Sequence, residues 1–329
     1  MSKFLGSANT TLLAVLAALL ATFALAIGEK FFSAGNLRSM AFQMPEMGLL
    51  SLAMMVPLLS GGINLSIIAG ANLCALAMAF ILTRYAPGTQ GAVWVAWQVL
   101  ALLAGFALAG LIGLVNGVII AYLRVSPILA TLGTMTICKG ISIGLTRGNV
   151  LSGFPEPIVY LGNGTIYGVP VALLIFLACA LPLAVLLART PFGIATAMMG
   201  SNERATLFSG VDTRRVTVTV YVLSSLLAAV AAVVMMARFN SANASYGESY
   251  LLVTILACVL GGIDPAGGAG RVPGLMIALV ILQLISSAFN QLDISPFLTL
   301  AIWGAILIAV TAVPALRARV AGLVHVLRG

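Results

Sequence analysis

A series of long apolar runs along all 329 residues constrains this chain more than any other feature. A helix needs about 20 apolar residues to cross a bilayer, and it satisfies its own backbone hydrogen bonds there. We therefore expect about ten transmembrane helices, at residues 9–27, 45–59, 65–82, 93–122, 128–145, 169–187, 216–237, 250–260, 272–291 and 296–313. The second and eighth segments are short for a crossing, and the fourth is long. The expected fold class is an all-α polytopic membrane protein with a single transmembrane domain over residues 1–329.

The composition supports this expectation, because 61% hydrophobic and 7% charged residues leave too little polar surface for a water-soluble globule. The first run contains Ala24-Leu25-Ala26, which resembles a signal-peptidase site, but its leading region carries only Lys3. We expect a retained first span rather than a signal peptide.

The net charge of +8 is explained by the positive-inside rule rather than by nucleic-acid binding. An even number of spans puts both termini on one side. With that side in the cytoplasm, ten Lys and Arg residues lie inside and five outside, so we expect cytoplasmic termini with a basic tail at 315–329.

Residues 189–215 form the main polar loop between two apolar runs. Within it, Asn202 can cap a short helix over 202–208, and Glu203 lies in the first turn, where the helix dipole favours an anion. Such a helix could dock on a soluble partner, and a re-entry loop without a partner is the alternative. The residues predicted to couple to a partner are Asn202, Glu203, Ala205, Leu207, Phe208, Ser209 and Gly210.

Two other regions leave alternatives open. Each short span is followed by a similar four-residue motif, GGIN at 61–64 and GGID at 261–264. This similarity indicates either an internal repeat of interrupted spans or simply tight turns and close packing. The connection at 146–168 is rich in Gly and Pro. It is either an external lid or a solvated loop with aromatic anchors at the membrane edge.

Enzyme chemistry is disfavoured by missing residues. The only histidine is His325, in the basic tail, so no intramembrane Ser–His dyad or histidine-built metal site is expected. No phosphate-binding GxxxxGK[ST] motif occurs, so the chain is expected to bind no cofactor, and any ATP must be used by a partner.

Uncharged polar residues inside the apolar runs could replace water around a neutral hydroxylated solute. Hydrogen bonding between helices is the alternative for each of them. Lys139 could pair with a carbonyl, line a watery cavity or extend its amine toward the interface. The candidate translocation path consists of Asn64, Ser66, Asn72, Asn116, Thr134, Lys139 and Asn290.

Four stretches resemble the permease subunits of bacterial ABC importers of the ribose/xylose type, a family that also includes autoinducer-2 permeases. They are SGGINLS at 60–66, SPILATLGTMTICKGI at 126–141, PFGIATAMMGSNERATLFSGVD at 191–212 and LGGIDPAGGAGRVPG at 260–274. The family usually has GGIDLSVG where this chain has GGINLSIIAG, so Asn64 stands in place of an acid.

The resemblance implies a ten-span importer fold in the bacterial inner membrane, with residues 202–208 as the coupling helix. It also implies a cytoplasmic ATPase subunit, a second permease copy or related permease, and a periplasmic or lipoprotein solute-binding protein. The expected function is import of a monosaccharide or similar small polar solute. A stand-alone secondary carrier or channel is the alternative, and it would transport without ATP.

Overall fold

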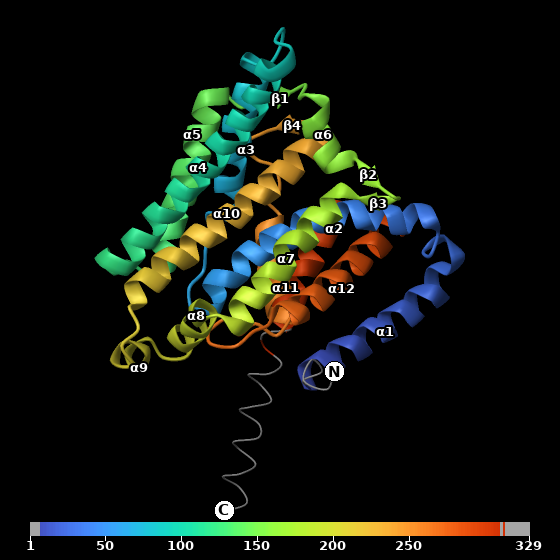
Figure 1. Ribbon diagram of the computed structural model, residues 1–329. Coiled ribbons are helices and arrows are strands. Elements are labelled where there is room, and N and C mark those ends of the chain that lie inside the picture. Colours follow the sequence, from blue (N-terminus) through green and yellow to red (C-terminus); the bar gives the residue numbers. More distant parts are fainter. Residues whose placement is uncertain (1–6, 310–311, 313–329) are drawn as a thin grey trace, which may run out of the picture.

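The computed structural model describes residues 7–309 and residue 312, so the predicted tail at 315–329 lies outside the described residues (Figure 1). Helices dominate. The long helices are α1 (Ser7–Ile27), α2 (Ala34–Leu59), α3 (Ile67–Arg84), α4 (Gly91–Leu123), α5 (Pro127–Thr146), α7 (Val171–Arg189), α10 (Thr213–Phe239) and α12 (Val272–Gln291). The short elements are η1 (Gly28–Lys30), α6 (Glu156–Asn163), α8 (Pro191–Ser201), α9 (Glu203–Phe208), α11 (Tyr250–Leu260), β1 (Leu151–Ser152), β2 (Thr165–Ile166), β3 (Val169–Pro170) and β4 (Ser241–Ala242). A further helix spans Pro296–Ala309.

Each of the ten predicted apolar segments overlaps a helix, and residues 310, 311 and 313 of the tenth segment lie outside the described residues. Seven helices in the described part of the chain are long and apolar enough to cross a bilayer, namely α2, α3, α4, α5, α7, α10 and α12. The apolar parts of α1, α11 and the helix at 296–309 are shorter. The chain is therefore a helical multi-pass membrane protein, while ten crossings stay a prediction.

The predicted start of the second segment was wrong, whereas its end at residue 59 is confirmed. Helix α2 begins at Ala34 rather than at residue 45. The prediction began too late because the first turns of the helix carry polar residues, which a search for apolar runs leaves out. The Ser33 side chain caps this start by accepting a hydrogen bond from the Asn36 amide. With 26 residues, α2 is long enough to cross, whereas α11 has the predicted 11 residues.

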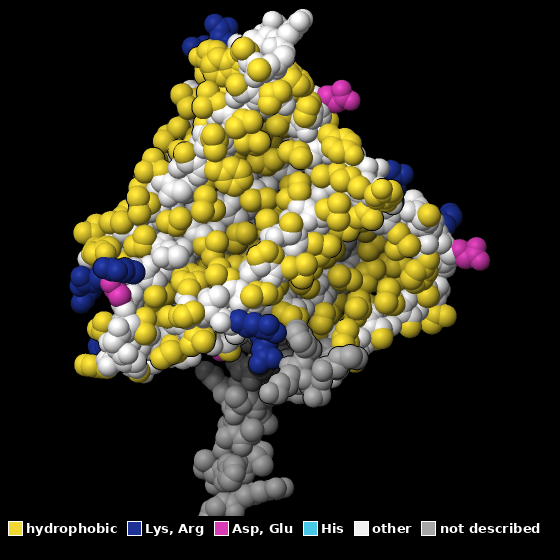
Figure 2. Space-filling model, in the orientation of Figure 1, with side chains coloured by type: hydrophobic (Ala, Val, Ile, Leu, Met, Phe, Trp, Pro, Cys, Tyr) yellow, Lys and Arg dark blue, Asp and Glu magenta, His cyan; other side chains and the backbone are white. Residues whose placement is uncertain are grey.

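Helices α2, α3 and α10 form the centre of the molecule (Figure 1). Helices α4 and α5 pack on one side of this centre, and α7, α11 and α12 pack against α2 on the other, with α1 outside α12. In the 18-residue apolar stretch of each helix, 83% of the residues are buried in α2 and 78% in α10, but only 28% in α5 and in α7. The outer helices thus form a broad hydrophobic surface with charged side chains at its edges, as Figure 2 shows.

Helix α4 packs closely on α10 through small residues. A β-carbon at Gly113 would lie 2.6 Å from the Val222 Cα, and one at Gly117 would lie 2.7 Å from the Val218 Cα. These glycines therefore allow the two backbones to approach, which is the usual reason for small residues spaced by four in membrane helices.

The connection at 146–168 is more ordered than the sequence indicated. It contains α6, and its strand β1 pairs with β4 after α10. The Asn163 side chain donates to the carbonyls of Ala237 and Arg238, at 3.0 and 3.1 Å, which ties α6 to the end of α10. Phe154, Tyr160 and Tyr167 are the aromatic residues predicted to anchor this connection at the membrane edge. Phe154 is buried, whereas Tyr160 and Tyr167 are exposed, so the three differ in environment.

Candidate functional site at the end of α9

The short helix predicted at 202–208 is present as α9. The Asn202 side chain accepts a hydrogen bond from the Ala205 amide at 3.0 Å, and Glu203 occupies the first turn. Gly210 follows with a φ of +83°, which ends the helix in the left-handed region that favours glycine. Leu207 and Phe208 are 57% and 89% exposed, so α9 presents large apolar side chains to its surroundings.

Helices α2 and α11 end in the same way, although they are 200 residues apart in the sequence. At the end of α2, Gly61 has a φ of +80° and the Gly62 amide donates to the Pro57 carbonyl at 2.9 Å. At the end of α11, Gly262 has a φ of +81° and the Ile263 amide donates to the Cys258 carbonyl at 3.0 Å. Both are Schellman helix ends. The GGIN and GGID motifs therefore mark tight turns. The left-handed glycine is the first glycine of GGIN and the second glycine of GGID.

The turn after α2 and the loop that follows the α11 turn meet α8 in a cluster that we call the glycine junction, formed by Gly61, Gly200, Gly267 and Gly268. A β-carbon at Gly200 would overlap the Leu59 carbonyl oxygen and the Gly268 amide nitrogen, and one at Gly267 would lie 2.6 Å from the Gly61 Cα. The Gly268 amide also donates to the Leu59 carbonyl at 2.9 Å. The segment that carries α9 is thus in direct backbone contact with the end of α2 and with the loop that follows α11.

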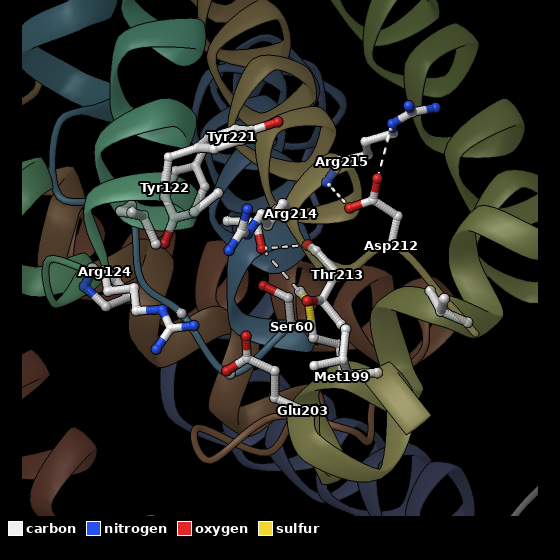
Figure 3. A pocket seen from close by; sticks show the side chains of 18 of the residues that line it. Ser60, Tyr122, Arg124, Met199, Glu203, Asp212, Thr213, Arg214, Arg215 and Tyr221 are labelled. Carbon is white, nitrogen blue, oxygen red and sulfur yellow. Dashed lines mark hydrogen bonds and ion pairs between the residues drawn. The ribbon is translucent and has the colours of Figure 1, made fainter. Parts of the chain in front are cut away.

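A pocket of about 1030 Å³ lies beside α9, and we call it the α9 pocket. Figure 3 shows Arg124 from the end of α4, Arg214 from α10 and Glu203 from α9 around it. Arg214 lies over the Tyr122 ring at 5.5 Å, while Arg215 forms an exposed ion pair with Asp212. The lining of the α9 pocket includes two carboxylates and a larger number of arginines, namely Arg124, Arg204, Arg214 and Arg215. The electric field in this pocket therefore favours anionic groups.

Four of the predicted path residues form one buried hydrogen-bonded chain, which we call the amide network. Its members are Thr134, Asn116, Ser66 and Asn64, joined by Ser224. Thr134 donates to Asn116 at 2.6 Å, Asn116 to Ser66 at 2.9 Å, Ser66 to Asn64 at 2.7 Å and Asn64 to Ser224 at 2.9 Å. Ser224 then donates to the Ala53 carbonyl at 2.7 Å.

The amide network lies next to the α9 pocket. The Tyr221 hydroxyl lines that pocket and lies 3.4 Å from the carbonyl oxygen of Ile63, the neighbour of Asn64. The network joins α2, α3, α4, α5 and α10, and every side chain in it is paired. In the described structure it therefore holds helices together, and its part in transport stays a prediction.

The other three predicted path residues lie elsewhere. Asn72 donates to the carbonyls of Ala244 and Tyr246. Lys139 forms an ion pair with Glu248 at 2.8 Å, with both side chains about half exposed. Asn290 lines a second pocket of about 530 Å³ between α2, α11, α12 and the helix at 296–309, which we call the α12 pocket. The described structure does not join the seven residues into one path.

The sequence reasoning missed an ion pair between Glu46 in α2 and Arg238 at the end of α10. Arg238 Nη1 lies 3.1 Å from Glu46 Oε1, and the carboxylate is fully buried. A buried carboxylate without a partner is costly, so this pair ties α2 to α10. Glu46 lies one residue inside the predicted second segment. A carboxylate inside an apolar segment usually has a charged partner, so this position could have indicated the ion pair.

Comparison with known proteins gives consistent descriptions. Residues 36–311 match the family model described as branched-chain amino acid transport system / permease component. The ribose import permease protein RbsC of Bacillus subtilis (strain 168) is 35% identical over 86% of each chain. The L-arabinose transport system permease protein AraH of Escherichia coli (strain K12) is 30% identical over 83% of this chain and 80% of its own. The autoinducer 2 import system permease protein LsrD of Escherichia coli (strain K12) is 31% identical over 80% and 78%. No solved structure matches.

Proposed function

The chain belongs to the family of branched-chain amino acid transport system permease components, and on that premise we propose that it is the membrane subunit of an ATP-binding-cassette importer for a monosaccharide or similar small polar solute. Relatives that align over most of the chain carry the names of ribose and L-arabinose permeases. They are named for transport rather than for catalysis, so ATP hydrolysis is assigned to a partner subunit and no cofactor to this chain.

The observation that carries the coupling proposal is the glycine junction. Since α8 contacts the end of α2 and the loop after α11 through backbone atoms, a displacement of α9 is passed to α2 and to this loop with little loss. The exposed Leu207 and Phe208 provide the apolar contact for an ATPase subunit, and Asn202, Glu203, Ala205, Ser209 and Gly210 shape the helix that presents them.

The basic lining of the α9 pocket supports the proposed orientation. Arg124, Arg204, Arg214 and Arg215 gather at the α9 side, as the positive-inside rule expects of a cytoplasmic face. We accordingly assign the chain to the bacterial inner membrane with both termini in the cytoplasm. A second permease copy or related permease, and a solute-binding protein on the opposite face, complete the proposed complex.

Phe208→Asp tests the coupling proposal, with Phe208→Leu as the matched control. A charge at this 89% exposed position should prevent docking of the co-expressed ATPase subunit, so that it no longer co-purifies and ATP-driven uptake is lost. Phe208→Leu should keep both. Normal uptake by Phe208→Asp would contradict the proposal. Sugar uptake by this polypeptide alone in liposomes, independent of ATP, would support the secondary-carrier alternative.

A further inference from the structure

The α12 pocket lies at the opposite end of the molecule from α9. Gln43 of α2 lines this pocket, and Leu59 of the same helix contacts the glycine junction. Sixteen residues separate them, which corresponds to about 24 Å along a helix axis. With α9 in the cytoplasm, as the proposed function requires, the α12 pocket opens toward the outer face.

Several polar side chains of the α12 pocket have free hydrogen-bonding capacity. Gln283, 5% exposed, donates to the Gln43 side chain at 3.3 Å, and no described residue donates to its own carbonyl oxygen. The side chains of Ser286, Asn290 and Asp293 form no hydrogen bond or ion pair with described residues. Amide, hydroxyl and carboxylate groups are therefore available to a solute that offers several hydroxyls.

Aromatic rings line the same pocket. Phe289 and Trp303 have centroids 6.0 Å apart, and Trp303 is nearly buried, so its ring is held in place. Such rings provide an apolar wall against which the C–H face of a sugar ring can pack, while polar groups fix its orientation.

The charge of the α12 pocket disfavours anionic solutes. Its lining contains the carboxylate of Asp293 and no lysine or arginine among the described residues. Asp293 has a φ of +52°, and the Ile294 amide donates to the Phe289 carbonyl at 2.9 Å, so this carboxylate lies at a fixed helix end. A carboxylate accepts hydrogen bonds from hydroxyl groups and repels phosphate or a second carboxylate.

We propose that the α12 pocket receives the neutral polyhydroxylated solute on the outer side of the permease, with Asn290 and Ser286 donating to its hydroxyls and Trp303 packing against its ring. The inference rests on the proposed function and deepens it by locating the solute. The amide network, whose groups are already paired, is a separate structural feature.

Cysteine labelling tests the location and the ligand. In intact cells a membrane-impermeant maleimide should label Asn290→Cys, with wild-type protein as the background because three of its cysteines are buried. At least one of D-ribose, L-arabinose, D-xylose and D-galactose should slow this labelling. Labelling only after the membrane is opened, absence of protection by all four sugars, or protection by a small amine instead would overturn the inference.

Transport tests the residues in the complete complex of permease, ATPase and solute-binding protein in proteoliposomes. At saturating sugar-loaded binding protein, Asn290→Leu and Ser286→Ala should each lower uptake by about tenfold, the effect of losing one good hydrogen bond. Asn149→Leu, a change at an exposed asparagine of the opposite bundle edge, should leave uptake unchanged.

Two failures are distinguishable in this assay. Normal uptake by both pocket variants would overturn the solute site while leaving the importer function intact. If wild-type complex shows no ATP-dependent uptake of any sugar, the proposed function itself fails, and with it the solute site that rests on it.

Discussion

The amide network and the α12 pocket contain the same kinds of side chain in opposite states. In the network, Asn64 and Asn116 are fully buried and each donates and accepts a side-chain hydrogen bond. In the α12 pocket, Asn290 is exposed and unpaired among the described residues. Paired groups hold helices together, whereas unpaired groups can bind a solute, so the pairing state rather than the residue type separates the two regions.

The largest effect on stability is expected at the glycine junction. Gly200→Val places a β-carbon against the Leu59 carbonyl and the Gly268 amide, which are backbone atoms that cannot move aside. We expect a loss of about 3 kcal/mol of stability, seen as a lower melting temperature in detergent, and loss of uptake.

Gly133→Val is the matched control for this substitution, because a β-carbon at Gly133 of α5 would meet no atom within 4 Å. It should leave the melting temperature nearly unchanged. Equal melting temperatures for the two variants would show that the junction is not closely packed.

Asn116→Leu breaks the amide network with a side chain of similar size. It leaves Thr134 without its acceptor at 2.6 Å and Ser66 without its donor at 2.9 Å, in a buried site. We expect a destabilisation of about 1–3 kcal/mol, measured as the shift in melting temperature. An unshifted melting temperature would mean that the network contributes nothing to stability.

Asn290→Leu applies the same chemical change to the α12 pocket and sharpens the contrast. Because the Asn290 side chain has no partner among the described residues, the stability of the Asn290→Leu variant should stay within about 0.5 kcal/mol of wild type. The measurement is the melting temperature beside that of Asn116→Leu. A loss as large as that of Asn116→Leu would remove the distinction between the two regions.

Lys139→Met should have a small effect on stability. Lys139 and Glu248 are 43% and 50% exposed, and an exposed ion pair contributes about 0–1 kcal/mol. The melting temperature at low and high salt measures this contribution, since salt screens such pairs. A salt-independent loss well above 1 kcal/mol would indicate that the pair is shielded from solvent.

Local features of the fold could be predicted from the sequence. The helices at 250–260 and 272–291 have the predicted bounds, and Asn202 caps α9 as its residue type indicated. The predicted start of α2 was too late because Arg38 and Gln43 interrupt the apolar run. The family prediction from four motifs is confirmed by the family match and by relatives named as ribose and L-arabinose permeases.

The candidate site was predicted only as a set of residue types. Asn116 and Asn290 are both polar residues in apolar helices, and nothing nearby in the sequence tells which one is paired. Ser224 completes the network from 160 residues beyond Asn64, and Arg238 neutralises Glu46 from another helix. Partners at such distances follow from helix packing rather than from local pattern.

The sequence by itself determined that this chain is a helical membrane protein, roughly where its long apolar helices lie and which family it belongs to. Apolar run length and capping residues act within a few residues of chain, so they can be read locally. Only the tertiary structure decided that Gly61, Gly200 and Gly267 touch, that four path candidates hydrogen-bond to one another and that Asn290 has no partner among the described residues. Contact and hydrogen-bond pairing depend on how separate helices pack, and a linear pattern does not contain that information.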